Sequence, residues 1–294
     1  MKPFEEVPFA MMERDRVAFE PPGSLLSLEY VKREGPFRMS VDHYHSFYEI
    51  YFLLSGTRRY FIRDRSYLVE QGDLVFVDRQ SLHKTTEAGT DNHERLVIYF
   101  YEPLLRQSYK AESEILLSPF RRHDNPVLRF PVKERLQAEA IAHKLLYEMR
   151  SRETGHELAI RSGVIELLLL AARCVDKNDA AASADPLDTP LYRLMSDVAR
   201  HVNRHYAEDL SLPDLAEHFH ISPYYLSRMF KQATGFNLNE YINLTRIQAA
   251  ERLLKESDMS IIDVSAAVGY NNFSHFGKMF KKLTKQSPRA YRKG

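Results

Sequence analysis

Cysteine is almost absent from this sequence, since Cys174 is the single one among 294 residues. One cysteine can form neither an internal disulfide nor a zinc site built from several cysteines, so we expect a protein of a reducing compartment. A secretory signal is also lacking, because three glutamates lie within the first 13 residues, where a signal peptide needs an uninterrupted apolar core. The longest apolar run, from Val164 to Val175, contains two charged side chains and is too short to cross a bilayer. We therefore expect a soluble cytoplasmic protein without a membrane partner.

Signatures of catalysis are lacking too. The sequence contains no glycine-rich phosphate-binding loop and no pattern of a hydrolase triad. It does contain enough apolar material for two cores, because 44% of the 294 residues are hydrophobic and a domain takes about 100–200 residues. A disordered chain is excluded, and we expect a two-domain protein that is not an enzyme.

Acidic side chains are absent from the C-terminal end. Over the whole chain 41 Lys and Arg balance 40 Asp and Glu, but no carboxylate side chain follows Asp263. The same segment carries seven cations, which are Lys278, Lys281, Lys282, Lys285, Arg289, Arg292 and Lys293. Such a basic stripe is typical of a surface that neutralises phosphates, which favours nucleic acid as a partner. A solvated helix face followed by a frayed terminus is the alternative explanation.

The pattern of the chain changes along its length. Up to about residue 125, short runs rich in Tyr, Phe, Val and Ile alternate with turn signals, which is typical of a β-sandwich or barrel. The strands we predict are 49–54, 59–62, 67–69, 74–77 and 96–101. The domains we predict are a β domain at 1–130, a helical pair at 131–175 that Gly155 divides, a small and polar linker at 176–189, and an all-helical domain at 190–294.

The helical pair has an apolar face that must be covered. Leu136, Ala140, His143 and Tyr147 follow helical spacing on one face of its first helix. This face covers either the β domain or a second copy of itself. The second alternative is a homodimer, which is the assembly we expect.

The helical domain contains an internal repeat. Two short helices joined by a tight turn, at about 212–233, recur at about 262–283. Seven residues of the first copy have an identical or similar residue 50 positions later. In the first copy they are Leu226, Arg228, Met229, Phe230, Lys231, Thr234 and Tyr241. Their counterparts in the second copy, in the same order, are Phe276, Lys278, Met279, Phe280, Lys281, Thr284 and Tyr291. Each copy is predicted to be a helix-turn-helix unit, whose second helix enters the DNA major groove.

The outward positions of the two second helices are the candidate DNA contacts. We predict a DNA-binding set of Ser222, Tyr224, Ser227, Arg228, Lys231, Asn272, Ser274, Lys278 and Lys281. Arg228 is the sharpest candidate, because a guanidinium can bond a guanine edge bidentately. Gly277 has no side chain with which to contact a base, so the second unit is expected to contribute through phosphate contacts.

One continuous helical pattern, 238–255, connects the two units. Eighteen residues at about 1.5 Å each span roughly 27 Å, and neighbouring major-groove segments on one DNA face lie about 34 Å apart. We therefore predict that the domain contacts two successive major-groove segments.

Residues 190–294 resemble the DNA-binding domain of the AraC/XylS family of bacterial transcription regulators. The segments that carry the resemblance are LSLPDLAEHFHISPYYLSRMFKQATG and SIIDVSAAVGYNNFSHFGKMFKKLTKQSPRAYRK. Lys285 stands where the family usually has a turn glycine, and Gly277 where a small polar residue is common. The resemblance implies double-stranded DNA as a partner, and RNA polymerase as well if the protein is an activator.

Two runs of the first domain resemble the cupin motifs. The run from His43 to Glu49, followed by Gly56, is similar to the first motif. The run GDLVFV at 72–77, followed by His83, is similar to the second, with Asp78 and Gln80 in place of the usual proline and glycine. His43, His45 and Glu49 have the same parity, so a strand would turn all three into the barrel.

These side chains suit either of two ligands. With His83 they could hold Zn²⁺, Mn²⁺, Fe²⁺ or Ni²⁺, and the same imidazoles and carboxylate can hydrogen-bond a polyol. The resemblance implies a cupin-like domain that usually senses a small molecule, often a sugar, without a metal. The effector-binding set we expect is Arg38, His43, His45, Glu49, Tyr51, Tyr60 and His83, with Arg58, Ile62 and Phe76 as further candidates for the barrel interior.

The sequence therefore predicts an α+β fold of two domains, a cupin-like β-barrel with a helical pair and an all-α tandem helix-turn-helix. The predicted function is a sequence-specific DNA-binding transcriptional regulator that is controlled by a small molecule such as a sugar. No cofactor is expected. The alternatives are a metal-sensing regulator or a metal-dependent cupin enzyme, both with His43, His45, Glu49 and His83 as metal ligands.

Overall fold

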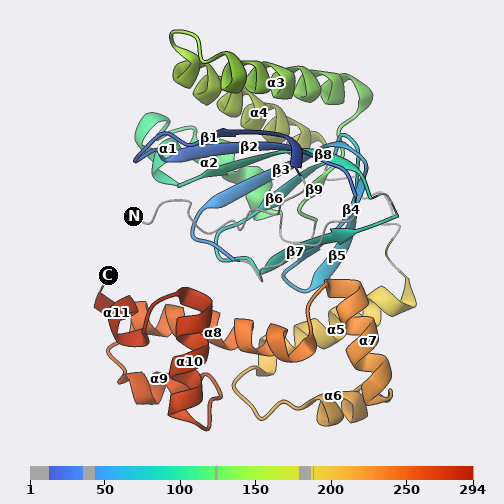
Figure 1. Cartoon of the computed structure of the whole chain (residues 1–294), viewed down its shortest axis with the longest axis vertical. Coiled ribbons are helices and arrows are strands. Elements are labelled where there is room, and N and C mark those ends of the chain that lie inside the picture. Colours follow the sequence, from blue (N-terminus) through green and yellow to red (C-terminus); the bar gives the residue numbers. More distant parts are fainter. Residues whose placement is uncertain are drawn as a thin grey trace. The chain divides into compact units, whose positions relative to one another are not determined.

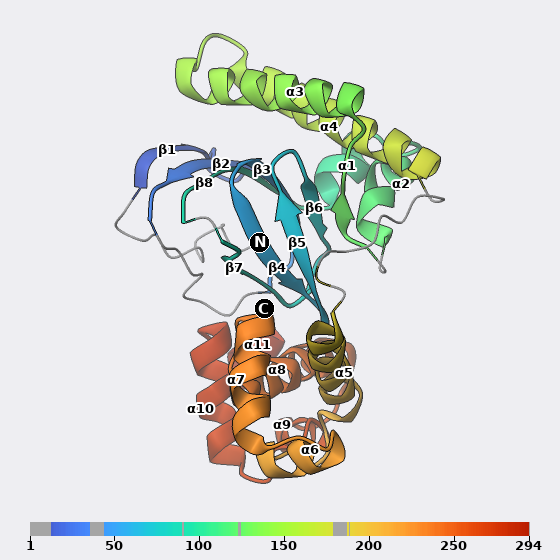
Figure 2. The same ribbon diagram turned by 90° about the vertical axis from the view of Figure 1, so that its right-hand side faces the viewer.

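A computed structural model of the chain describes residues 13–35, 44–89, 91–122, 125–178, 187 and 189–293. The chain divides into two compact units, Met1–Ile62 with Tyr67–Pro186 and Leu187–Gly294 with Arg63–Ser66. In the described residues the first unit holds two sheets and a layer of helices, and the second is built around helices (Figures 1 and 2). The predicted α+β fold of two domains is confirmed. No helix among these residues is long and apolar enough to cross a membrane.

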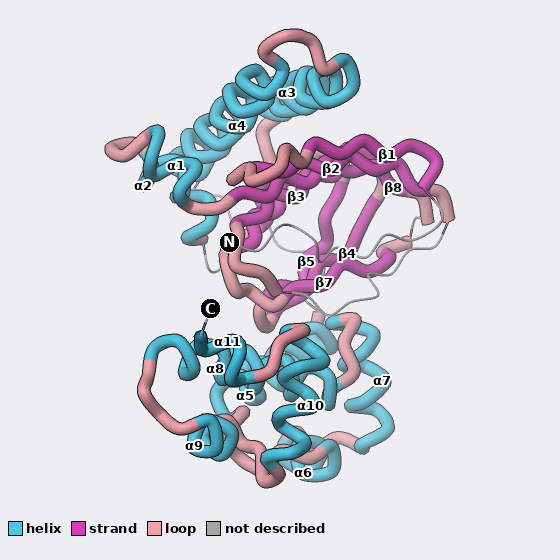
Figure 3. Tube along the Cα trace, turned by 60° about the vertical axis from the view of Figure 1, so that its left-hand side comes forward, coloured by secondary structure: helices cyan, strands magenta, loops and turns pink. Residues whose placement is uncertain are grey.

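The strands of the first unit form two sheets with antiparallel pairing (Figure 3). The larger sheet has the order β1 (Glu13–Phe19), β2 (Leu26–Arg33), β8 (His93–Phe100), β3 (Tyr48–Ser55), β6 (Leu74–Val77) and β9 (Val127–Leu128). The smaller sheet has the order β5 (Arg65–Glu70), β4 (Thr57–Ile62) and β7 (His83–Glu87). The five predicted runs form β3, β4, β5, β6 and β8, whereas β1, β2, β7 and β9 were not predicted.

Both faces of β3 are buried, which explains its almost unbroken apolar sequence. Ile50 and Phe52 belong to the core that includes the helical layer. Tyr51 and Leu53, which point to the opposite face, belong to the core between the two sheets. Glu49 has the parity of Tyr51, so it lies on the face turned into the sandwich.

Helices cover the outer face of the larger sheet (Figures 1 and 3). They are α1 (Pro103–Ser108), α2 (Ser113–Leu117), the 3₁₀ helix η1 (Ser118–Arg121), α3 (Val132–Ser151) and α4 (His156–Asn178). The break between α3 and α4 includes Gly155, as predicted, although Arg152 with φ 49° is the left-handed residue that ends α3. Helix α4 extends past residue 175 into the segment predicted as a linker, and residues 179–186 and 188 of that segment lie outside the described residues.

The face of α3 that we predicted from apolar spacing does not cover the sheet. Leu136 is 59% and Tyr147 57% exposed, whereas Leu145 and Met149 are buried. The buried stripe is therefore offset around the helix from the predicted one, and the predicted face points outward.

The second unit is a tandem of similar helical modules around α8 (Leu238–Glu256) (Figure 1). Helices α6 (Leu212–His218) and α7 (Pro223–Thr234) lie near one end of α8, and α9 (Ile261–Ala267) and α10 (Phe273–Thr284) near the other. Helices α5 (Pro190–His205) and α11 (Pro288–Lys293) complete the unit. The ring of Tyr241 on α8 packs 5.4 Å from that of Phe230, while Ile247 shares a core with Phe276 and Phe280.

The repeat extends to individual hydrogen bonds. The hydroxyl of Thr234 donates to the carbonyl of Phe230 at 2.8 Å, and that of Thr284 donates to the carbonyl of Phe280 at 2.8 Å. Each hydroxyl also accepts from the backbone N–H two residues on, at 3.1 and 3.2 Å. The two modules are therefore equivalent in local structure as well as in sequence.

Candidate nucleic-acid interface and effector site

Each second helix of the tandem starts with a polar cap. The hydroxyl of Ser222 accepts from the N–H of Tyr225 at 3.2 Å, and Pro223 occupies the first turn. The Asn272 side-chain oxygen accepts from the N–H of His275 at 2.9 Å. Ser222 and Asn272, which we predicted as DNA contacts, thus satisfy N–H groups of their own helices. The caps fix where α7 and α10 begin and hence which residues face outward.

The buried stripe of each helix leaves its opposite face exposed. Leu226 and Phe230 of α7, and Phe276 and Phe280 of α10, are fully buried. All nine predicted DNA-binding residues are exposed, namely Ser222, Tyr224, Ser227, Arg228, Lys231, Asn272, Ser274, Lys278 and Lys281. Neither helix contains a carboxylate side chain, so the exposed charges on both are positive.

Sequence reasoning missed further exposed residues on the same helices. They are Tyr225 and Gln232 on α7, and Phe273 and His275 on α10. Phe273 directly follows the cap and is 49% exposed, which is unusual for a phenylalanine. The cap at Asn272 already indicated that Phe273 is the first residue of the helix, but Phe273 was not included among the outward positions.

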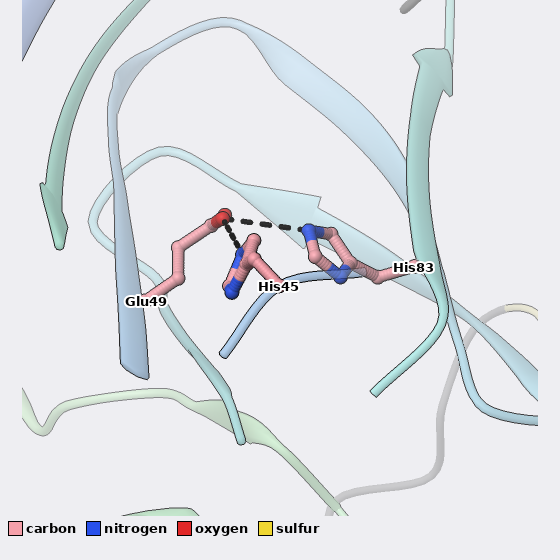
Figure 4. A group of neighbouring side chains, drawn as sticks. All are labelled: His45, Glu49 and His83. Atoms are coloured by element: carbon pink, nitrogen blue, oxygen red, sulfur yellow. Dashed lines mark hydrogen bonds and ion pairs between the residues drawn. The ribbon is translucent and has the colours of Figure 1, made fainter. Parts of the chain in front are cut away.

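In the first unit, Glu49 contacts His45 and His83 between the sheets (Figure 4), and it also binds Tyr60. Its Oε2 lies 3.0 Å from Nε2 of His45 and 3.4 Å from Nε2 of His83. Its Oε1 accepts from the Tyr60 hydroxyl at 2.6 Å. All four side chains are buried. Burial alone would raise the pKa of Glu49, but His83 and His45 hold it well below its usual value.

The other ring nitrogen of each histidine faces a backbone carbonyl. Nδ1 of His45 lies 2.9 Å from the Phe47 oxygen, and Nδ1 of His83 lies 2.8 Å from the Ser81 oxygen. A carbonyl can only accept, so both Nδ1 atoms carry the proton. Burial lowers the pKa of His45, although its bond to Glu49 opposes the shift. The carboxylate of Glu49 can only accept as well, so a hydrogen bond to it requires a proton on Nε2. Without that proton, the Nε2 lone pairs and the carboxylate can share a cation, and the three ligand atoms lie within 4.8 Å of one another.

The route by which His45 reaches Glu49 differs from the prediction. We assigned both to one strand by parity, but β3 begins only at Tyr48 and His45 lies in the segment before it. The segment bends so that the imidazole stacks on Phe47, with ring centroids 3.9 Å apart. His43 and Arg38 lie outside the described residues.

The other residues predicted for the barrel interior lie in two different cores, one between the sheets and one on the helical side of the larger sheet. Tyr51 is buried between the sheets, where its ring meets that of Tyr60 edge-on at 5.2 Å. Arg58 is fully buried and Ile62 lies in the same core. Phe76 was wrongly included, because it pairs with Ile50 and joins the core on the helical side.

Sequence reasoning also missed polar residues of the sandwich interior. Arg33, His93 and Arg95 are buried on β2 and β8. They were missed because β2 was not predicted and the predicted strand 96–101 began after His93 and Arg95. In a strand every second residue points to the same face, so extending the strand backward from Val97 and Tyr99 would have placed His93 and Arg95 on the inner face.

Comparison with known proteins covers both units. Residues 32–168 match the family described as AraC-like ligand binding domain, and residues 215–294 match the family described as helix-turn-helix domain. The regulatory protein PocR of Salmonella typhimurium is 36% identical over 104 residues, which are 35% of this chain and 34% of PocR. The HTH-type transcriptional activator RhaS of Klebsiella pneumoniae is 26% identical over 255 residues, which are 86% of this chain and 87% of RhaS. A crystal structure of ToxT from Vibrio cholerae aligns with 92% of this chain and 97% of that one, at 12% identity and a TM-score of 0.39.

A ligand-binding domain followed by tandem helix-turn-helix units defines a DNA-binding transcriptional regulator under effector control. The chain belongs to the AraC/XylS family of transcriptional regulators.

Proposed function

We propose that α7 and α10 enter two successive major-groove segments of one operator. The observation that supports this proposal is the equivalence of the two helices, which share their caps, their buried stripes and an exposed face without carboxylates. Arg228 on α7 specifies a base, because its guanidinium can bond a guanine bidentately. Gly277 occupies the corresponding region of α10, where Lys278 and Lys281 supply phosphate contacts.

Fluorescence anisotropy with two DNAs tests these roles. The first duplex is selected from a randomised pool by the full-length protein, and the second is a random duplex of equal length. Arg228→Ala should cost about 1–3 kcal/mol on the selected duplex and much less on the random one. Lys281→Ala should weaken both similarly and reduce the salt slope by about one. Lys133→Ala, at an exposed position on α3, is the control.

Two results would contradict the proposal. Equal losses on both duplexes for Arg228→Ala would remove its assigned role in base recognition. A hydroxyl-radical footprint that protects a single groove segment would remove the second helix from the interface.

The sensor unit is proposed to bind its effector between the two sheets, near Glu49, His45, His83, Tyr51 and Tyr60. Effector binding would shift the population between states that differ in DNA affinity, without any catalytic step. The protein would act in the cytoplasm as a homodimer, and would contact RNA polymerase if it activates transcription. An effector that binds but changes neither DNA affinity nor transcription would contradict this control.

A divalent cation is the second candidate effector. Two imidazole Nε2 atoms and a carboxylate oxygen converge, and both Nδ1 atoms donate to backbone carbonyls, which is the support that metal-bound histidines commonly have. Elemental analysis of protein purified without chelators is the test. Stoichiometric Zn, Mn, Fe or Ni that is lost in His83→Gln and kept in His143→Gln, at an exposed position, would favour a metal-sensing regulator. Absence of metal, with no cation raising the melting temperature, would exclude it.

A further inference from the structure

We propose that Arg246 on α8 fixes the second helix-turn-helix module relative to the first, and thereby sets the operator spacing that the protein accepts. Arg246 is then a positioning residue, which acts through the two modules and not by a contact with a base. The inference rests on the proposed function, because it takes α7 and α10 as the two helices that enter the DNA. It goes further by naming the side chain that holds these helices at one separation.

The guanidinium of Arg246 binds the backbone at the end of α5. Its Nε donates to the carbonyl of Tyr206, the residue at which α5 ends, at 2.7 Å, and its Nη2 donates to the carbonyl of Glu208 at 2.8 Å. The last carbonyls of a helix have no partner within it, and an arginine can supply one. Residues 206–208, which we call the junction segment, lead from α5 toward α6, and α7 packs on both of these helices. Arg246 is therefore bonded to the backbone that carries the first module.

The turn of the second module packs on the same junction segment. Gly269 lies between α9 and α10 with φ 86°. A Cβ there would lie 2.7 Å from the carbonyl oxygen of Ala207 and 2.9 Å from that of Tyr206, which is too close for any side chain. The backbone conformation and the close approach both favour glycine at this position. The turn that leads into α10 thus contacts directly the backbone that Arg246 binds.

Tyr270 continues the connection toward α10. Its ring centroid lies 5.5 Å from the guanidinium carbon of Arg246, and its hydroxyl donates to Oδ1 of Asn243, three residues earlier on α8, at 2.8 Å. The same ring packs 5.4 Å from that of Phe276, which belongs to the buried stripe of α10. Tyr270 is buried, and a cation over an aromatic ring is held more strongly where water is excluded. Arg246 therefore also contacts the residue that anchors the second module.

These contacts form a continuous path between the two DNA-facing helices. The path runs from α7 through α5 and the junction segment to Arg246, and from Arg246 through Tyr270 to α10. The apolar core of the second module, which includes Ile247 and Phe276, holds α10 on α8 by burial, which is not directional. Hydrogen bonds are directional, so the two bonds of Arg246 and the bond of Tyr270 fix the angle at which the modules are joined.

A fixed angle and separation restrict the DNA that the protein can bind. One base pair inserted between two groove segments moves the second segment by about 3.4 Å and rotates it by about 35°. Two rigidly joined helices cannot follow this change. Loosely joined helices can follow it, but they lose the affinity that a preorganised arrangement provides. The dependence of affinity on operator spacing therefore measures how rigidly the two modules are joined.

Binding of the full-length protein to a series of operators tests the inference. The selected duplex is the starting point, and one or two base pairs are inserted or deleted between the two segments that the hydroxyl-radical footprint protects. We expect one inserted base pair to weaken binding of the wild type by about tenfold or more. For Arg246→Ala we expect about tenfold weaker binding at the original spacing, but a further loss of only about threefold or less on insertion. A spacing profile of Arg246→Ala that parallels the wild-type profile would overturn the inference.

Matched variants separate positioning from charge and from folding. Arg252→Ala removes a cation from an exposed position on the same helix and should keep the shape of the wild-type profile, so an equal flattening by this variant would also overturn the inference. Arg246→Lys keeps the charge but loses the paired donors, and should behave more like Arg246→Ala than like the wild type. Tyr270→Phe loses the bond to Asn243 and should flatten the profile to a smaller extent. If Arg246→Ala proves unfolded by circular dichroism, wild-type profiles for both milder variants would overturn the inference.

Failure of the proposed function would give a different result. If α10 does not enter a second groove segment, the wild-type footprint covers one segment and insertions beside it leave the wild-type affinity unchanged. Both the proposed function and the role of Arg246 would then be wrong. A footprint of two segments with a steep wild-type profile that Arg246→Ala leaves unchanged would keep the proposed function and contradict the positioning role alone.

Discussion

At the scale of single residues, Lys285 marks a difference between the two modules. Helix α7 ends at Gly235 with φ 82°, whereas α10 ends at Lys285 with φ 60°. The left-handed region is unfavourable for residues other than glycine. Lys285 is the residue that stands where the family usually has a turn glycine, and its positive φ explains that preference.

We predict that Lys285→Gly raises the free energy of unfolding of the helical domain by about 0.5–1 kcal/mol, because glycine removes the strain of this conformation. Lys282→Gly, inside α10, should instead lower it by about 1 kcal/mol. Urea unfolding followed by circular dichroism measures both. A destabilised Lys285→Gly protein would show that the lysine side chain outweighs the backbone strain.

His93 predicts how the stability of the sensor unit depends on pH. Its pKa is lowered to about 3 by burial and by the nearby arginines, while in the unfolded chain it is about 6.5. Between these values the unfolded state binds the additional proton, so stability falls as pH falls below about 6.5. We expect His93→Gln to lose less stability than the wild type between pH 7 and pH 5, by up to about 2 kcal/mol. Parallel pH curves for the two proteins would argue against a buried neutral His93.

Individual site residues were predictable where a strand or cap fixed their direction. Glu49, Tyr51 and Tyr60 lie in the interior as parity indicated. His45 also lies there, but by way of a bend before β3 that parity cannot predict. Arg58 was among the candidates for the interior, whereas Arg33 and Arg95 were missed because β2 was not predicted and the predicted strand 96–101 began after Arg95.

At the scale of elements, α10 differs from its counterpart α7 by a glycine. Gly277 lies in its interior, and a Cβ there would meet no atom within 4 Å. Packing within the chain therefore does not require glycine. Close approach of the backbone to a DNA phosphate is a reason that remains, and it agrees with the phosphate contacts that we propose for this module.

We predict that Gly277→Ala stabilises the helical domain by about 0.5–1 kcal/mol but weakens its binding to the selected duplex. The reciprocal change on α7, Ser227→Gly, should reduce stability. Thermal unfolding and anisotropy on the same samples give both quantities. Gly277→Ala with unchanged DNA affinity would show that α10 does not approach the duplex at this position.

Helix positions were easier to predict than strands and helix faces. Ser222 with Pro223, and Asn272, fixed the starts of α7 and α10 because caps are local chemistry. Strands β2 and β7 escaped prediction because neither contains an unbroken apolar run: charged residues interrupt β2 (LSLEYVKR), and β7 (HKTTE) has no apolar side chain. Apolar spacing identified α3 but not which of its faces is buried.

At the scale of the whole molecule, the outward face of the helical pair is the surface most suited to a second copy. Between α3 and α4 lies a groove of about 390 Å³, lined by Gln137, Ala140, Ile141, Lys144, Glu166, Leu169, Leu170 and Arg173. Its charges are of both signs, which allows one copy to complement another across a two-fold axis. Helix α3, which forms one side of this groove, also exposes Leu136 and Tyr147.

We predict that Leu136→Glu combined with Ala140→Glu turns a dimer into a monomer, because two carboxylates then meet their copies across the axis. Ile115→Glu, at a 52% exposed position on α2, removes a similar apolar side chain elsewhere and should leave the dimer intact. Sedimentation velocity over a range of protein concentrations distinguishes the two species. The dissociation constant should rise by about tenfold or more in the double variant, since each buried interface charge costs more than 1.4 kcal/mol. A wild-type protein that sediments as a monomer, or a double variant that still dimerises, would move the interface away from these helices, and cooperation between copies on DNA would then have to arise within the helix-turn-helix domain.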